Sequence, residues 1–306
     1  MGALLVLAFS EILLFLHVPI VSDYFYLLAW WSYIIFADGI IFKTQGRSFL
    51  RPDPRLLFSM GSWSITTWLL FELFNLRLQN WHYINLVSNT AVRWTGYTFA
   101  YATVLPGLFA TYLLLKNMGL FTQVRTKKSI RYTPSKLKIF QIIGLLFLIL
   151  PLVWPKYFFP LVWGGFVLLL EPFNYKSGAN SLLADLEKGS LAKPAQLLAA
   201  GLLCGFLWEF WNFWATSKWV YTVPFVGNIK LFEMPILGFL GFPPFALECY
   251  VIYNFLVKHG LALSWEQDFL QEPAKKNVLA FQILWQIPFW LICYWLIDKY
   301  TVYSFK

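Results

Sequence analysis

Residues 142–153 read IIGLLFLILPLV, a run without one charged or hydrogen-bonding side chain. A half-buried strand would alternate apolar and polar residues, and neither this run nor its counterparts alternate as a β-barrel strand does. Apolar stretches of about 17 to 25 residues, the length of a helix that crosses a hydrocarbon core, recur along the chain. Lys, Arg, Pro, Gly and Asn fill the intervals between them. The pattern predicts an all-α, polytopic membrane helical bundle.

The composition excludes a soluble globular protein. Of the 306 residues, 59% are hydrophobic, 21% are aromatic and only 13% are charged, whereas about a quarter of a soluble domain is charged. The three cysteines, Cys204, Cys249 and Cys293, lie in apolar segments at no metal-ligand spacing, and we interpret them as small core residues. Residues 1–10 carry no charged side chain, which indicates a first helix and not a cleaved signal peptide.

Hydropathy predicts nine transmembrane helices, at about 3–17, 24–42, 56–74, 95–115, 139–153, 157–172, 195–214, 233–257 and 277–297. We predict a cell (inner) membrane protein with its N-terminus in the cytoplasm and its C-terminus outside, because this orientation places most basic residues on the inner side. The outer side keeps only Arg77, Arg93, Lys156, Lys218, Lys230, Lys299 and Lys306. The net charge of +9 then suits anionic inner-leaflet lipid. Because the basic residues are spread over several loops, we do not expect nucleic-acid binding.

Two halves of the chain resemble each other. Trp31 and Trp163 are each followed by an acid, a lysine and, 15 residues on, a glycine. Residues 71–83 and 208–221 share a Glu-x-x-Asn element followed by Trp-x-Tyr. The pattern predicts tandem parallel four-helix repeats, at 1–138 with a basic cytoplasmic loop and at 139–275, plus an additional helix in 276–306. Since each unit has four crossings, both should enter the membrane in the same direction.

Seven acids lie in or beside apolar segments, where a charge costs at least about 2.5 kcal/mol. In the predicted topology Glu72, Glu209 and Glu233 form an outer layer with Asn75 and Asn212, and Asp38, Glu171 and Glu248 form an inner layer; Glu11 is the seventh acid. Such residues should face the bundle interior or a wet cavity.

The two Glu-x-x-Asn pairs, Glu72 with Asn75 and Glu209 with Asn212, each lie on one helix face. The duplication predicts that they face each other, in which case one carboxyl should keep its proton and could act as a general acid oriented by the amides. The alternative is that the pairs cap helix ends and fix bundle geometry. Glu248 follows Pro243 and Pro244, which favour a kink beside a cavity, and we include it among the candidate catalytic residues.

Aromatic residues surround the candidate acids, as a pocket for an extended apolar or polyene substrate would require, although a membrane-interface belt and ordinary packing are alternatives. The residues expected to contact substrate are Trp81, Tyr83, Trp208, Trp211, Trp219, Tyr221, Glu233, Asp38 and Glu171. For Asp38 and Glu171 the sequence favours a structural role over substrate contact, because each lies near a helix end and a lysine. The sequence contains no nucleotide-binding or metal-binding motif, and we expect no cofactor and no metal.

The segment from Trp208-Glu209 through Trp219-Val220-Tyr221 to Pro235 resembles the membrane lycopene cyclase domain of the heterodimeric carotenoid cyclases. The resemblance covers about 50 residues, with an echo at 68–112. It implies a small duplicated membrane unit that protonates an isoprenoid double bond. The two adjacent acids that follow the family's proline are replaced here by Ile236 and Leu237, so the acids that the resemblance would imply as proton donors are absent from their usual place.

Three functional hypotheses follow. The first is an integral membrane enzyme that acts by acid catalysis on a lipid-dissolved isoprenoid or carotenoid, through Glu209 and Glu72. The second is a proton-coupled transporter or channel, since duplicated units with intramembrane acids at their junction also describe carriers. The third is a non-catalytic membrane assembly subunit. A sideways slot open to lipid favours the enzyme, and a pore open to water favours transport.

Overall fold

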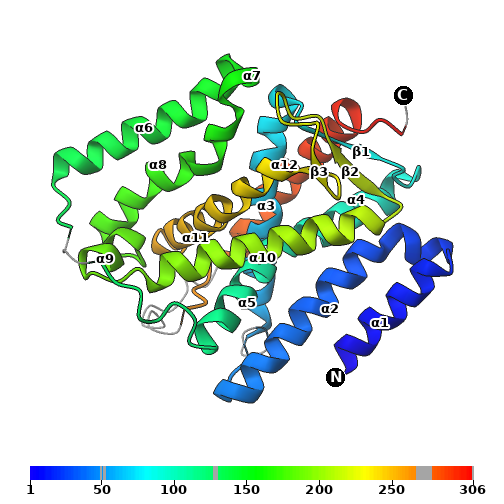
Figure 1. Ribbon diagram of the computed structural model, residues 1–306, viewed down its shortest axis with the longest axis horizontal. Helices are drawn as coiled ribbons and strands as arrows, with labels where there is room; N and C mark the ends of the chain where they lie inside the picture. The colour runs from blue at the N-terminus through cyan, green and yellow to red at the C-terminus, as the bar shows by residue number, and fades with distance from the viewer. Residues whose placement is uncertain (49, 51–52, 127–129, 267–277, 305–306) are drawn as a thin grey trace.

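The computed structural model describes residues 1–306 except 49, 51–52, 127–129, 267–277 and 305–306 (Figure 1). Within this part, seven helical segments are long and apolar enough to cross a membrane. They are α2 (Pro19–Gln45), α4 with α5 (Thr90–Tyr101 and Val104–Asn117), α6 (Pro134–Val153), α7 through η1 to α8 (Pro155–Phe158, Phe159–Leu161 and Val162–Ser177), α10 (Ala192–Trp214), η2 with α11 (Ile236–Gly241 and Phe242–Lys258) and α12 (Val278–Tyr300). The chain is an α-helical membrane protein, which confirms the predicted class.

Two other helices coincide with predicted spans. Helix α1 (Gly2–Phe15) has 14 residues, fewer than a perpendicular crossing needs. Helix α3 (Pro54–Leu78) has 25 residues but carries several buried hydroxyl groups, those of Ser59, Ser62, Ser64, Thr66 and Thr67. Helix α3 is therefore a helix of the protein interior, and a count of nine crossings remains a prediction.

The hydroxyl of Ser64 explains a break that the sequence did not predict. We expected one helix over 95–115, but α4 ends at Tyr101 and α5 begins at Val104. Ser64 Oγ donates to the carbonyl of Tyr101 (2.5 Å) and accepts from the N–H of Leu105 (3.0 Å). These bonds satisfy backbone groups that the break leaves unpaired, as the interior of a membrane protein requires.

Glycines allow two helix pairs to pack closely. Helices α6 and α8 lie side by side at the end of the molecule opposite α1 (Figure 1). A Cβ on Gly144 of α6 would lie 2.4 Å from the backbone nitrogen of Leu169 in α8. A Cβ on Gly201 of α10 would lie 2.4 Å from the carbonyl oxygen of Phe242 in α11. Small residues at such contacts are typical of helix pairs in lipid.

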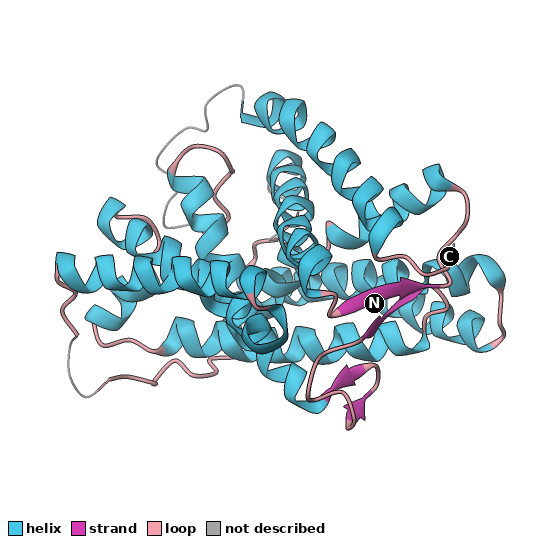
Figure 2. Cartoon of the chain, turned by 90° about the horizontal axis from the view of Figure 1, so that it is seen from above, coloured by secondary structure: helices cyan, strands magenta, loops and turns pink. Residues whose placement is uncertain are grey.

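Short strands join the halves of the chain. Strand β1 (Trp81–Ile84) pairs antiparallel with β2 (Lys218–Tyr221), and Figure 2 shows this ribbon lying across helix ends. A smaller hairpin is made of β3 (Lys230–Leu231) and β4 (Met234–Pro235). The segment after α12 joins the ribbon, because Tyr83 forms a parallel bridge with Val302. The sequence did not predict these strands.

The predicted unit boundary between residues 138 and 139 falls inside α6. The predicted boundary between 275 and 276 lies outside the described residues, as do the first position of the predicted ninth helix and Lys306. The short helix α9 (Leu182–Glu187) occupies the loop between α8 and α10.

Candidate functional site

Asn75 and Asn212 attach the ribbon to the helices that carry the candidate acids. The amide of Asn75 donates to the carbonyl of Trp81 (2.8 Å), and its oxygen accepts from the N–H of Trp81 (3.2 Å). Asn212 makes the same two bonds with Trp219, at 2.8 and 3.0 Å. Asn75 also accepts from the N–H of Asn80, just before β1, and the observed hydrogen bonds of both asparagines thus go to backbone groups rather than to the neighbouring carboxyls that we expected them to orient.

Glu72 is held by three donors on one oxygen. Its Oε1 accepts from Trp68 Nε1 (2.9 Å), Trp81 Nε1 (3.0 Å) and the hydroxyl of Tyr83 (2.5 Å). The side chain is 1% exposed, and Oε2 has no hydrogen-bond partner among the described residues. Two of the donors come from β1, so the carboxyl also secures the ribbon.

Glu209 has the corresponding place on the other half but fewer partners. Its Oε1 accepts from the hydroxyl of Tyr221 (2.8 Å), which in turn accepts from Trp219 Nε1 (2.8 Å). The Glu209 side chain is fully buried, and within the described part of the chain its Oε2 has no partner. Burial first, and then the nearby Glu209 carboxyl, raises the pKa of Tyr221 well above its ordinary value. The phenol therefore stays protonated and acts as the donor.

The ribbon connects the two carboxyls without bringing them into direct contact. Trp81 lies opposite Tyr221, and Tyr83 lies opposite Trp219, so all four side chains share the face that meets the helices. Tyr83 and Tyr221 reach Glu72 and Glu209, respectively. Neither carboxyl hydrogen-bonds the other in the described structure, so the aromatic residues of the ribbon separate the two acids.

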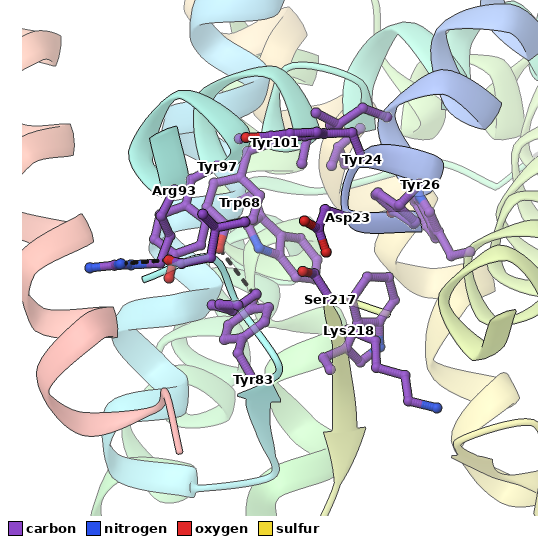
Figure 3. Close-up of a pocket in the computed structure, with 18 of the residues that line it drawn as sticks. Asp23, Tyr24, Tyr26, Trp68, Tyr83, Arg93, Tyr97, Tyr101, Ser217 and Lys218 are labelled. Carbon is purple, nitrogen blue, oxygen red and sulfur yellow. Dashed lines mark hydrogen bonds between the residues drawn. The ribbon is translucent and has the colours of Figure 1, made fainter. Parts of the chain in front are cut away.

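A pocket lies beside Glu209, and we name it the Glu209 pocket (Figure 3). Its empty volume is about 960 Å³ when its open mouth is included. Figure 3 shows Tyr83, Tyr97 and Tyr101 on one side, and Asp23, Ser217 and Lys218 on the other. The aromatic residues that line it are Tyr24, Tyr26, Trp68, Tyr83, Tyr97, Tyr101, Trp208, Trp219, Tyr221 and Phe242. Glu72 lies behind this wall, in hydrogen-bond contact with Trp68 and Tyr83.

A second apolar pocket adjoins the Glu209 pocket, and we name it the Trp163 pocket. Its empty volume, including the open part, is about 1270 Å³. Trp81 and Trp163 line it, and it shares four wall residues with the Glu209 pocket, namely Trp68, Trp219, Tyr221 and Phe242. The two pockets are therefore separated by a single layer of aromatic side chains.

Phe245 of α11 lies at the centre of an aromatic cluster between the two halves. Its ring centroid lies 5.1 Å from that of Phe71, 5.7 Å from Trp163 and 5.9 Å from both Trp68 and Trp208. Phe71 and Trp163 are themselves stacked at 5.2 Å. These rings pack against one another beside the residues that hold Glu72, and Trp163 and Phe245 also line the Trp163 pocket.

Glu248 is buried away from the Glu72 and Glu209 networks. Its Oε1 accepts from the N–H of Phe166 (2.9 Å), in the first turns of α8 beyond a kink at Trp163. Oε2 has no partner among the described residues. The observed contact is thus with a helix backbone, and Glu248 lines neither pocket.

Asp38 and Glu171 make matching contacts near the ends of α2 and α8. Each accepts hydrogen bonds from a serine hydroxyl ten residues later and from a leucine N–H twelve residues later. The partners are Ser48 (2.6 Å) and Leu50 (3.1 Å) for Asp38, and Ser181 (2.6 Å) and Leu183 (2.9 Å) for Glu171. Both acids hold the loop that follows their helix, and neither lines either pocket.

The remaining candidates are divided between the pocket wall and its surroundings. Trp208 lines the Glu209 pocket, whereas the Trp211 ring packs on Trp30 at 5.1 Å. Glu233 pairs with Lys218 at 2.7 Å. The ion pair holds the second half of the ribbon near the small hairpin.

Several pocket residues were not predicted. Trp68 and Tyr101 line the Glu209 pocket and are not among the residues that the sequence indicated as substrate contacts. Arg93, also in its wall, makes two bonds with Asp298 of α12, at 2.9 and 2.6 Å, and Asp298 also accepts from Tyr97 (2.9 Å). An acid near the end of an apolar helix was the available signal for Asp298.

Within the described residues, no group of three or more His, Cys, Asp or Glu side chains could hold a metal ion. No family model matches this chain, and no curated protein or solved structure matches it either.

Proposed function

We propose that this protein is a membrane enzyme that binds a lipid-dissolved isoprenoid or carotenoid in the Glu209 pocket and protonates one of its double bonds. The observation that carries the proposal is the buried Glu209 carboxyl, whose Oε2 has no partner in the described structure, in the wall of an aromatic pocket. A carboxyl in apolar surroundings favours its neutral form, which can act as a general acid. The faces of Trp68, Trp208 and Trp219 suit the cation that protonation would create.

The pocket is positioned for entry from the side. Leu27 of α2 lines both the Glu209 pocket and an apolar groove whose other residues come from α1, α2 and α4. Val92 and Phe99 of α4, beside the pocket and the groove respectively, are exposed. A hydrophobic substrate would reach the carboxyl through this surface without passing through water.

The aromatic cluster around Phe245 is the reason to prefer an enzyme over a transporter. A proton-coupled carrier needs a continuous polar path between the outer and inner acids. Phe71, Trp163 and Phe245 pack beside the Glu72 network with their ring centroids 5.1 to 5.7 Å apart. Apolar rings packed at this spacing favour a barrier that interrupts a polar path between the outer and inner acids.

A finer architecture accompanies this function: two copies of one four-helix unit, with nine crossings in all. The matching Asn–ribbon bonds and the matching loop bonds of Asp38 and Glu171 support the repeat. So does the ribbon register, since an axis that exchanges Trp81 with Trp219 also exchanges Tyr83 with Tyr221. Such an axis along the membrane normal suits parallel repeats.

The predicted orientation places Lys43 inside and Lys156 outside. Each is replaced by cysteine in turn, and intact cells are treated with a membrane-impermeant maleimide. We expect labelling at position 156 and none at 43 until the cells are opened. The reverse pattern would place the N-terminus outside.

The function is tested by its products. Pigments and polyprenyl lipids are extracted from a host that makes acyclic carotenoids, with the gene, without it, and with Glu209→Gln. We expect a new isomer with the intact gene, and none without the gene or with Glu209→Gln. Glu11→Gln, an exposed acid of α1, is the control for expression and should behave as the unaltered protein. Identical profiles with and without the gene would remove the proposal.

A further inference from the structure

Two tyrosines connect the wall of the Glu209 pocket to the second buried carboxyl. The hydroxyl of Tyr101 donates to that of Tyr83 (3.1 Å), and the hydroxyl of Tyr83 donates to Glu72 Oε1 (2.5 Å). Both tyrosines line the pocket and are labelled in Figure 3. An unbroken chain of hydrogen bonds therefore runs from the pocket wall to Glu72.

The two carboxyls have environments that suit opposite protonation states. All three groups bound to Glu72 are donors directed at one oxygen, and an ionised carboxylate is an acceptor only. Glu209, in the pocket wall, accepts one hydrogen bond, from Tyr221, and this smaller number of donors suits a carboxylic acid. Paired carboxyls with such different surroundings are the usual arrangement for one acid and one base.

We propose that Tyr101, Tyr83 and Glu72 form a proton-accepting relay, so that the pocket catalyses a rearrangement of an alkene, by ring closure or double-bond migration, without any change in the substrate's formula. This inference rests on the proposed function, because it needs Glu209 to supply the first proton. It adds a second catalytic group, Tyr101, on the wall opposite Lys218.

The reaction balances without an oxidant or a reductant. The O–H bond of Glu209 breaks, and the π electrons of a double bond form a C–H bond with that proton, which leaves a carbocation. In ring closure, a second double bond then attacks the cation. Finally a C–H bond next to the cationic carbon breaks, and its electron pair forms the new double bond.

The released proton follows the hydrogen bonds already present. It passes to Tyr101 Oη while Tyr101 gives its own proton to Tyr83 and Tyr83 gives one to Glu72. Burial, and then the Glu72 carboxyl, raises the pKa of Tyr83 well above its ordinary value, so this phenol passes a proton on but does not remain ionised. One cycle moves one proton from Glu209 to Glu72, and exchange with water restores the starting state.

The relay is tested in Tyr101→Phe, which keeps the ring and its stacking on Tyr97 (5.7 Å) but removes the hydroxyl. Tyr97→Phe is the matched control, since Tyr97 lines the same pocket but its hydroxyl donates to Asp298. Membranes of the host described above, with its own acyclic carotenoids and polyprenyl lipids, are suspended in ²H₂O. Product and solvent deuterium in the recovered substrate are both measured by mass spectrometry.

We expect Tyr101→Phe to form product about a hundredfold more slowly, the usual contribution of a positioned general base. Its recovered substrate should carry solvent deuterium, because Glu209 still protonates the double bond and the cation reverts. Tyr97→Phe should form product as the unaltered protein does. A structural role for Tyr101 would lower product and deuterium together.

The two proposals fail in different ways. Normal product formation by Tyr101→Phe, or an equal loss in Tyr97→Phe, would overturn the relay and leave the proposed function standing. If the unaltered protein forms no product and introduces no deuterium, both proposals are overturned. Loss of product without deuterium in Tyr101→Phe, with the unaltered protein active, also overturns the relay.

Discussion

Replacing Glu72 by leucine should destabilise the protein more than the same change at Glu209. Glu72→Leu leaves three buried donors without their acceptor, those of Trp68, Trp81 and Tyr83. Glu209→Leu leaves only the hydroxyl of Tyr221, which keeps its bond from Trp219. If each buried donor left without an acceptor costs about 1 kcal/mol, the free energy of unfolding falls by about 3 kcal/mol in Glu72→Leu and by about 1 kcal/mol in Glu209→Leu.

The comparison isolates the hydrogen bonds. Both changes replace a buried carboxyl in a helix by an apolar side chain, so both variants gain the same free energy from no longer burying a polar group, and this gain cancels in the comparison. We expect Glu72→Leu to be less stable than Glu209→Leu by about 2 kcal/mol.

The assay is reversible unfolding of the purified protein in mixed micelles with increasing dodecyl sulfate, followed by far-ultraviolet circular dichroism. The free energies of unfolding are compared at the same micelle composition. Equal stability of the two variants, or a larger loss of unfolding free energy in Glu209→Leu, would contradict the unequal numbers of donors around the two carboxyls. The same inequality supports the assignment of Glu209 as the acid and Glu72 as the base.

Three further predictions concern packing and the ribbon. Gly144→Ala places a methyl group against the α8 backbone and should cost about 1 to 3 kcal/mol of unfolding free energy in the same assay, whereas Gly164→Ala, whose added methyl meets nothing within 4 Å, should cost far less. Asp298→Ala removes the carboxylate that pairs with the buried guanidinium of Arg93, which keeps its bonds to the carbonyls of Val87 and Ser88, and should lower stability by about 3 kcal/mol, while removal of both Arg93 and Asp298 should cost less than the sum of the single changes. Asn212→Ala should speed hydrogen exchange at the backbone amide of Trp219, read by mass spectrometry of proteolytic fragments, with the rate at distant amides of α6 unchanged.

The apolar runs were enough to predict the class of the protein and most of its helices. Segments such as 139–153 and 195–214 lie within α6 and α10, because hydrophobic length is a local property that the membrane itself selects. The same holds for the position of the acids, since an acid in an apolar run is visible in the sequence. The repeat and the number of crossings remain predictions.

The features that the sequence did not predict depend on contacts between residues far apart in the chain. The ribbon pairs Trp81 with Tyr221, 140 positions apart, and no local pattern specifies such a pairing. The break between α4 and α5 depends on a hydroxyl from α3, and the partner of Arg93 comes from α12.

The sequence by itself determined that this chain prefers a membrane to water and that it carries two similar carboxyls, because hydrophobicity and residue type do not depend on contacts with distant residues. It presented Glu72 and Glu209 as equivalent, each three positions before an asparagine. Only the tertiary structure made them different, by directing three donors at Glu72 and opening a pocket beside Glu209. The physical reason is that the state of a buried carboxyl depends on the groups around it, and folding brings those groups together from distant parts of the chain.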